Sequence, residues 1–259
     1  MIKKFDLLGL ILPIFLVFLW GYVTVTNIAP SYILPSPSKV VISLFDFAFG
    51  TNSSSPYSGQ MLEHTLMSLK RVCTGFLLGG GLGFVLGIAS AAVQYVNRIF
   101  ATSIHILRAM PGIGWLPIAM VWFGVGEKTS IFLIGIAAFF PIYMNTLQGA
   151  GAVDPLQYRA ARMLGAKKLQ LLTSIMIPSA LPQILVGLRI GLSISWAYVV
   201  LGELTGVNKG LGAVMMDARM LGRLEMILVM MVCIAVLGRI TDQFLLLLYR
   251  FIRPFEIKK

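Results

Sequence analysis

Long apolar segments recur along this chain and constrain its fold more than any other feature. A helix of about 20 apolar residues crosses the ~30 Å hydrocarbon core of a bilayer. With 58% hydrophobic and 12% charged residues among 259, the chain is typical of polytopic membrane proteins. The sequence predicts an all-α fold: one transmembrane domain, residues 1–259, with six membrane-spanning helices. The predicted spans cover residues 7–26, 71–93, 99–124, 130–149, 183–204 and 225–248.

The distribution of basic residues predicts how these spans are oriented. The first apolar segment follows Lys3 and Lys4 and is too long for a cleaved signal peptide, so we expect a retained span. With the N-terminus inside, eleven of the 21 Lys and Arg residues lie in inner segments and seven in outer segments. Cytoplasmic segments carry the excess of positive charge. We therefore expect cytoplasmic N- and C-termini, with the segment 153–182 also in the cytoplasm.

Several kinds of chemistry are excluded by the composition. The chain has no Gly-x-x-x-x-Gly-Lys-Ser/Thr loop to cradle nucleotide phosphates, so it is not expected to hydrolyse ATP or to act as an enzyme. Its only histidines are His64 and His105, which argues against a zinc or di-iron site. Cys73 and Cys233 lie in apolar runs and are expected to be buried free thiols. The net charge of +11 is spread between spans, so nucleic acid is not an expected partner.

A stripe of small residues marks the second predicted span. Gly75, Gly79, Gly83 and Gly87 recur every four residues, which puts them on one face of a helix. Such a face lets another helix approach closely. A phosphate-binding glycine loop is the alternative, but it would need a preceding strand and a following Lys-Ser/Thr. Helix packing is therefore the predicted role.

The segment 153–182 reads as two short helices joined at a glycine. Asp154 suits the N-cap, Pro155 the first helical position and Gly165 a left-handed C-terminus. A second helix is expected from about residue 168 to 177, ending before Pro178. The segment is amphipathic and basic: its apolar face carries Leu156, Ala160, Met163 and Leu164, and its cations are Arg159, Arg162, Lys167 and Lys168. Physically, either a lipid surface or a partner protein could meet it.

The spacing of residues in this segment resembles a known motif. Ala160, Ala161, Gly165, Ile175 and Pro178 are spaced as in the EAA loop of permease subunits of bacterial ABC importers. In that family the loop is the coupling helix that sits in a cleft of the cytoplasmic ATPase. The chain departs from the pattern at Arg159, where Glu is usual, and at Ile177, where Leu is usual. The resemblance implies this set of ATPase-coupling residues: Asp154, Pro155, Arg159, Ala160, Ala161, Leu164, Gly165, Ile175 and Pro178.

Other phrases resemble one subfamily of these permeases, which imports sulfonates, taurine, nitrate, bicarbonate and pyrimidine thiamine precursors. The phrases are Leu107-Arg108 with Pro111, Trp122-Phe123-Gly124, and Phe139-Phe140-Pro141 with Asn145. The resemblance implies a homodimeric permease in the bacterial inner membrane and alternating access. It also implies two ATPase subunits that use ATP and Mg, and an extracytoplasmic solute-binding protein. The substrate is expected to be a small anion, with a pyrimidine thiamine precursor or another small organic molecule as the alternative.

Polar residues within the spans are the candidates for the pathway or its gate: Arg108, Asn145, Trp196 and Glu203. A charge at membrane depth is costly and usually faces a bundle interior or a water-filled cavity. Arg108 is therefore expected either to line a pathway for an anion, or to extend to the membrane surface or tie helices together through carbonyls. Glu203 is expected at the outer mouth, in a gate or packing role. Trp115, Trp122 and Trp196 are expected mainly to pack or to lie at the interface.

Three further charges within spans are interpreted structurally. Arg189 is expected to extend to the cytoplasmic surface, and Arg239 to pair with Asp242 at i and i+3. A gradient-driven secondary transporter remains an alternative function, although it would call for buried titratable relays or an inverted repeat. A membrane enzyme would call for clustered histidines or acids.

Overall fold

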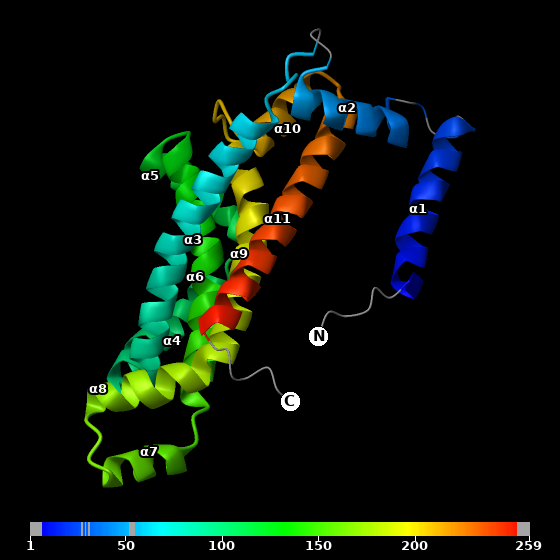
Figure 1. The fold of residues 1–259 in the computed structure, drawn as a ribbon. Helices are drawn as coiled ribbons and strands as arrows, with labels where there is room; N and C mark the ends of the chain where they lie inside the picture. Colours follow the sequence, from blue (N-terminus) through cyan, green and yellow to red (C-terminus); the bar gives the residue numbers. More distant parts are fainter. Residues whose placement is uncertain (1–6, 27, 29, 31, 52–54, 253–259) are drawn as a thin grey trace.

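The computed structural model describes residues 7–26, 28, 30, 32–51 and 55–252. Within them every regular element is a helix (Figure 1), which confirms the all-α prediction. In chain order the elements are α1 (Leu7–Val25), α2 (Pro37–Phe49), α3 (Met61–Ala92), α4 (Gln94–Ala109), a 3₁₀ turn at Gly112–Gly114, α5 (Trp115–Phe123), α6 (Glu127–Gly151), α7 (Pro155–Met163), α8 (Lys168–Leu171), a π-helical turn at Leu172–Met176, α9 (Ile177–Glu203), α10 (Leu211–Met220) and α11 (Leu224–Ile252).

Four helical segments of the described chain are long and apolar enough to cross a membrane: Met61–Ala92, Glu127–Gly151, Lys168–Glu203 and Leu224–Phe251. A fifth candidate combines α4 with the segment Gly112–Phe123. The first predicted span, residues 7–26, forms α1. Its apolar helical part Ile11–Val25 is shorter than the four segments above. The described residues thus contain four or five candidate spans, whereas the sequence predicted six.

The predicted span 99–124 is not one straight helix. α4 and the segment Gly112–Phe123 are bent by 91° at the break between them. Met110 has an extended backbone, with φ −68° and ψ 133°. Because Pro111 follows, the helical conformation is disfavoured at Met110, and the helix ends there. The chain therefore enters the bundle in α4 and leaves it in a different direction.

The helix predicted to end before Pro178 instead continues to Glu203, so that prediction is wrong. The chain accommodates Pro178 by widening one turn: the Ile177 N–H donates to the Leu172 carbonyl, five residues back. Pro178 then occupies the second position of the α-helical register that begins at Ile177. A missing N–H costs little there, because the first N–H groups of a helix have no partner in its own ladder.

α3, α6 and α9 run side by side as the centre of the bundle (Figure 1). The face of α3 that meets α6 carries the glycine stripe, and at Gly79 the two backbones touch. A Cβ added to Gly79 would lie 2.0 Å from the Gly135 carbonyl oxygen. The other glycines each meet α6 as well: Gly75 at Ile134, Gly83 at Phe139 and Gly87 at Thr146. On the α3 side of this contact side chains are thus absent, and such small residues permit close packing.

Both cysteines are free, but only Cys233 is buried. Cys73 was expected to be buried and is exposed. It lies two residues before Gly75, and the glycine face turns toward α6, so Cys73 points to the other side of α3. An apolar run in a membrane helix does not distinguish a side chain in the protein core from one that faces lipid.

The two ends of the bundle carry different elements. At one end α2 and α10 pack against α11 around the buried Phe47, Leu211 and Met230. α7 lies at the other end, below the bundle (Figure 1). α1 stands apart from the other helices, with mostly exposed side chains from Ile11 onward. One tie to the following segment is a hydrogen bond from Trp20 Nε1 to the Pro35 carbonyl, 3.0 Å long.

Candidate functional site

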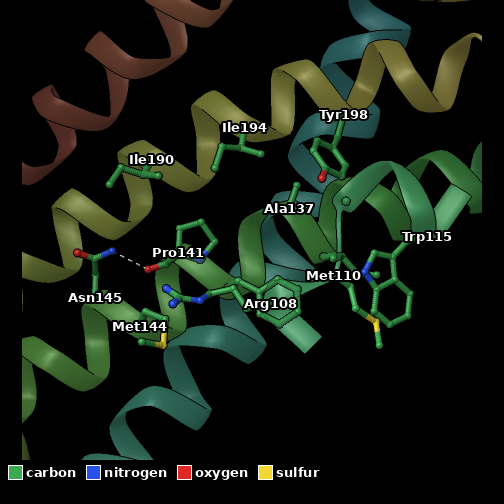
Figure 2. Close-up of a pocket in the computed structure, with 13 residues that line it drawn as sticks. Arg108, Met110, Trp115, Ala137, Pro141, Met144, Asn145, Ile190, Ile194 and Tyr198 are labelled. Carbon is green, nitrogen blue, oxygen red and sulfur yellow. Dashed lines mark hydrogen bonds between the residues drawn. The ribbon is translucent and has the colours of Figure 1, made fainter. Parts of the chain in front are cut away.

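A cavity of about 410 Å³ lies between α4, α6 and α9, beside the bend that follows α4 (Figure 2). Among the described residues that line it, Arg108 is the charged one. Most of the wall is apolar, and it includes Met110, Phe140, Pro141, Met144, Ile190 and Ile194. Trp115, Asn145 and Tyr198 contribute its other polar side chains.

The break in the helix brings Arg108 to the cavity. Arg108 lies in the last turn of α4, where the partial negative charge of the final carbonyls favours a cation. Beyond Pro111, the backbone of Gly112 is pressed against Tyr198. A Cβ at Gly112 would come within 1.1 Å of the Tyr198 hydroxyl oxygen. The bend thus forms part of the wall, and Arg108 points toward Pro141 and Met144 of α6 (Figure 2).

The guanidinium of Arg108 has no compensating acid among the residues that the structure describes. Its side chain is exposed and makes no ion pair or side-chain hydrogen bond with another described residue. Nearby, Trp115 Nε1 is a buried donor without a partner in the described part of the chain. An unpaired cation and an unpaired donor both favour an occupant that accepts hydrogen bonds and carries negative charge.

Asn145 lines the same cavity but uses its amide within the protein. Its Nδ2 donates to the Pro141 carbonyl at 2.8 Å, and its Oδ1 accepts from Gln183 Nε2 at 3.0 Å. The first bond lies within α6, and the second joins α6 to α9. Asn145 therefore holds the two walls of the cavity together.

Trp196, another candidate from the sequence, lies outside this cavity. It is 3% exposed, and its Nε1 donates to Thr241 Oγ1 at 3.0 Å, which packs α9 against α11. Sequence reasoning missed Tyr198 and interpreted Trp115 as a packing residue, yet both line the cavity. The spacing of Ile190, Ile194 and Tyr198 at every fourth residue is the signal that could have placed Tyr198 on this wall.

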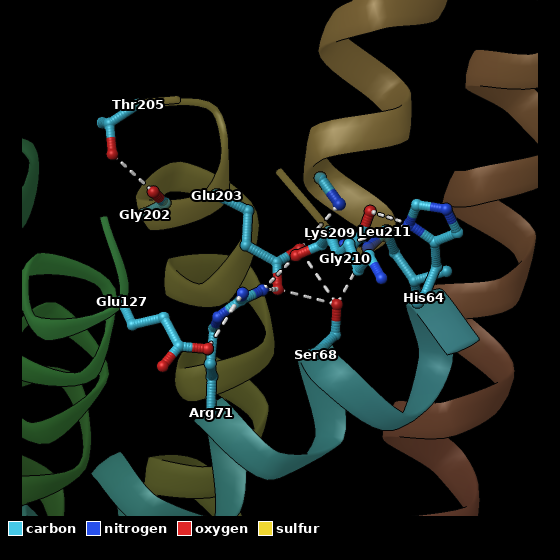
Figure 3. A network of polar contacts seen from close by, with 11 residues as sticks. His64, Ser68, Arg71, Glu127, Gly202, Glu203, Thr205, Lys209, Gly210 and Leu211 are labelled. Atoms are coloured by element: carbon cyan, nitrogen blue, oxygen red, sulfur yellow. Dashed lines mark hydrogen bonds and ion pairs between the residues drawn. The ribbon is translucent and has the colours of Figure 1, made fainter. Parts of the chain in front are cut away.

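Glu203 is also distant from the cavity, in a buried polar network at the end of α9 (Figure 3). It is 1% exposed. Its carboxylate accepts from Arg71 Nη1 at 2.7 Å, from Ser68 Oγ at 2.7 and 2.9 Å, and from the Gly212 N–H at 2.8 Å. A buried charge is tolerated when it is paired and hydrogen-bonded in this way. Glu203 therefore ties α9 to α3 and α10.

Arg71 connects this network to two further segments. It is 3% exposed, and its Nη1 also donates to the Lys209 carbonyl. Its Nη2 lies 3.3 Å from Glu127 Oε1 at the start of α6. Ser68 Oγ in turn accepts from the Leu211 N–H at 2.9 Å. The network thus joins α3, α6, α9 and α10 at one end of the bundle.

The α7 segment has the capped form that the sequence predicted. Asp154 Oδ1 accepts from the Leu156 N–H at 2.8 Å, Pro155 is the first helical residue, and Gly165 has φ +82°. Leu156, Met163 and Leu164 are 68%, 88% and 90% exposed. Large apolar side chains this exposed at the tip of a protein favour contact with another surface.

The remaining residues of this segment differ in burial. Ala160 and Arg159 are exposed, whereas Ala161, Ile175 and Pro178 are half-buried. Tyr158 packs back against the bundle near Met176 and Ala180. Burial raises the pKa of the Tyr158 hydroxyl. α7 is thus anchored on one side by Tyr158 and open on the other.

The predicted pair of Arg239 with Asp242 is present, but Asp242 also binds Arg189, which the sequence did not predict. Asp242 binds Arg189 with both oxygens, at 2.7 Å to Nε and 3.0 Å to Nη2. Arg239 Nη1 lies farther away, 3.5 Å from Asp242 Oδ2. Arg189 was expected to extend to the surface. The stronger pair joins α9 to α11 across 53 residues of sequence, which the local i, i+3 rule does not anticipate.

Comparison with known proteins gives consistent matches. Residues 82–254 match the family described as "Binding-protein-dependent transport system inner membrane component". The permease protein SsuC of Bacillus subtilis, assigned to aliphatic sulfonates transport, is 34% identical over 242 residues, 93% of this chain and 85% of SsuC. The taurine transport system permease protein TauC of Escherichia coli is 32% identical, over 95% of this chain and 88% of TauC. The nitrate import permease protein NrtB of Synechocystis is 33% identical, over 87% and 82%.

A solved structure is similar in fold. It is an inward-facing conformation of the MetNI methionine ABC transporter, with a TM-score of 0.52 and 16% identity. The match covers 68% of this chain and 92% of the other.

Proposed function

Because this chain belongs to the family of binding-protein-dependent transport system inner membrane components, we propose that it forms the pathway of an ATP-driven importer for a small anion. It is a multi-pass membrane permease of that family rather than an enzyme. The proposed solutes are of the sulfonate, taurine, nitrate or bicarbonate class. The observation that carries this choice is the uncompensated Arg108 in an otherwise largely apolar cavity.

The chemistry of the cavity supports a solute that carries one anionic group and whose remaining part forms few hydrogen bonds. Arg108 offers a planar set of donors that suits sulfonate, nitrate or carboxylate oxygens. The Trp115 indole also lines the cavity. The apolar side chains around them suit the short hydrocarbon part of an alkanesulfonate.

A second copy of the chain completes the pathway in this proposal. Arg98, Thr102 and His105 lie on one face of α4, are exposed, and have no side-chain partner among the described residues. Polar side chains on a membrane helix face water or protein rather than lipid. A homodimer that encloses α4 would satisfy them, and a solute-binding protein would deliver the solute from outside.

Energy would come from a separate ATPase that uses ATP and Mg. The segment 153–182 is the proposed coupling element, because α7 presents exposed Leu156, Met163 and Leu164 at its tip. This assignment places α7 and both termini in the cytoplasm of a bacterial cell, with α1 as the first of six spans in one domain. Glu203 and its network then lie at the outer ends of the helices.

Uptake into proteoliposomes tests the function. With the chain, its ABC ATPase and its solute-binding protein, we expect ATP-dependent accumulation of labelled taurine, an alkanesulfonate or nitrate. A hydrolysis-deficient ATPase should abolish it. Uptake driven by a proton or sodium gradient without ATP would instead support a secondary transporter. ATP-dependent uptake of a pyrimidine, with no anion transported, would overturn the anion assignment alone.

Replacing Arg108 with Gln tests the cavity. We expect the KM for the transported anion to rise roughly ten- to hundredfold, as the loss of a charged hydrogen bond worth about 1.5–3 kcal/mol implies. Arg108→Lys should retain part of the affinity because it keeps the charge. Arg219→Gln removes an exposed cation from α10 and should leave KM unchanged. Wild-type KM in Arg108→Gln would show that the cavity does not bind the solute through this charge.

A further inference from the structure

A second hollow, of about 530 Å³, lies between α9 and α11. Its wall includes Arg189, Ser193, Ile194, Gly238, Arg239 and Asp242. Ile190 and Ile194 line both this groove and the Arg108 cavity. The two spaces therefore flank one ridge of α9, on the part of the molecule where we place the pathway.

The groove contains more positive than negative charge. Arg189 and Arg239 face a single acid, Asp242, among the described residues that line it. Asp242 is engaged by Nε and Nη2 of Arg189, which leaves Nη1 of Arg189 available. The ion pair of Arg239 among the described residues is the 3.5 Å contact with Asp242. With its amide turned so that the oxygen faces Arg239, Gln243 accepts from Nη2, Nη1 and Nε at 2.8, 3.0 and 3.3 Å, but a neutral amide leaves the charge uncompensated.

The depth of Arg239 makes its exposure informative. It lies fifteen residues after Leu224 and thirteen before Ile252 in α11, roughly 20 Å from either end at 1.5 Å per residue. Its side chain is 69% exposed, and that of Arg189 is 42% exposed. An arginine at the middle of a span is costly in lipid. The groove must therefore meet water, protein or an anion.

We propose that this groove is a second oxyanion-binding site on the same translocation pathway. Arg239 and the free Nη1 of Arg189 are its cationic donors, and Ser193, which is exposed on α9, adds a hydroxyl. The ligand class is the same as for Arg108: a small solute with a sulfonate, carboxylate or nitrate group. The ion pair with Asp242 holds Arg189 in place and limits the net charge of the groove to about +1. A net charge this small allows the anion to be released as well as bound. The inference rests on the proposed function for its ligand.

Thiol chemistry tests the groove without requiring transport. In the assembled transporter, with Cys73→Ser and Cys233→Ala, Ser193→Cys is treated with anionic sulfonatoethyl methanethiosulfonate or cationic trimethylammonioethyl methanethiosulfonate. Each rate is divided by that reagent's rate with a free thiol in solution. We expect the anionic reagent to be favoured at least about tenfold, because clefts lined by one sign of charge concentrate the opposite ion. Val186→Cys, in the same groove, provides a second position.

Arg239→Gln should remove this preference while the transporter still assembles with unchanged subunit stoichiometry by native mass spectrometry. Leu77→Cys on the exposed side of α3 is the control position and should show no preference for the anion. Failure of both groove cysteines to react, with assembly intact, would mean that protein or lipid fills the groove and would overturn the proposal. So would equal or greater reactivity toward the cation, or loss of assembly in Arg239→Gln.

The uptake assay separates this proposal from the proposed function. If no anion is imported by wild type but the charge preference is present, the oxyanion site stands and the importer assignment fails. If an anion is imported, Arg239→Gln should lower its uptake at least about tenfold, in line with one charged hydrogen bond. Unchanged uptake would exclude the groove from the pathway.

Discussion

Glu203→Ala is expected to destabilise the protein more than any other single change in the described structure. It would leave Arg71, 3% exposed, buried without its main acid, together with unpaired donors at Ser68 and Gly212. Breaking a buried ion pair by removing one partner costs about 3–5 kcal/mol. We expect a clear drop in the thermal unfolding midpoint, measured by size-exclusion chromatography of heated, detergent-solubilised protein.

A double-mutant cycle distinguishes the pair from general damage. Arg71→Met combined with Glu203→Leu removes both charges and should be less destabilised than either single variant, because no buried charge is left alone. Glu63→Gln is the matched control: it breaks the exposed pair with Lys209, and exposed pairs contribute little to stability. An unchanged midpoint in Glu203→Ala would contradict the structural role assigned to this network.

The second large effect is expected at α7. Gly165→Pro with Ala161→Asp should abolish co-purification of the ATPase with the permease and eliminate ATP-dependent uptake. Gly165 has φ +82°, which proline cannot adopt, and Ala161→Asp places a charge on a half-buried position of the helix. The readout is the amount of ATPase retained by tagged permease in mild detergent.

Gln157→Ala, at an exposed position of the same helix, serves as the control and should retain the ATPase. The unfolding midpoint of the double variant should stay near wild type, because α7 lies below the bundle (Figure 1). If the variant retains the ATPase, α7 is not the coupling element. If wild-type permease binds no ATPase, the importer assignment itself fails.

The sequence predicted those parts of the structure that local rules determine. The caps at Asp154 and Gly165 follow from the preferences of single residues. The helical class follows from long apolar runs. Local rules failed at Pro178, because one π-helical turn lets a helix continue where a proline normally ends it. They also began the second span at residue 71 and treated residues 60–71 as a separate amphipathic helix, whereas α3 runs without a break from Met61 to Ala92.

The candidate site was predicted only in part, because its geometry depends on contacts distant in sequence. Arg108 was identified from its depth within a span, which one helix is enough to reveal. Arg71 and Glu203 are 132 residues apart, and Arg189 and Asp242 are 53 apart. Each of these four residues has nearer charged neighbours in the sequence. Only the packing of α3, α9 and α11 decides which charges meet.

The direct backbone contact between α3 and α6 limits how these two helices can move relative to each other. The contact between α6 and α9 is also tight, because a Cβ added to Gly187 would lie 3.0 Å from the Pro141 carbonyl oxygen and one added to Gly202 would lie 2.7 Å from Ser130 Cα. At Gly79 and Gly135 backbone meets backbone, and close-packed interiors do not deform continuously. The three helices α3, α6 and α9 would therefore move as one rigid unit. Any change between inward- and outward-open states would then fall to the bent α4–α5 segment, which carries Arg108 past that unit.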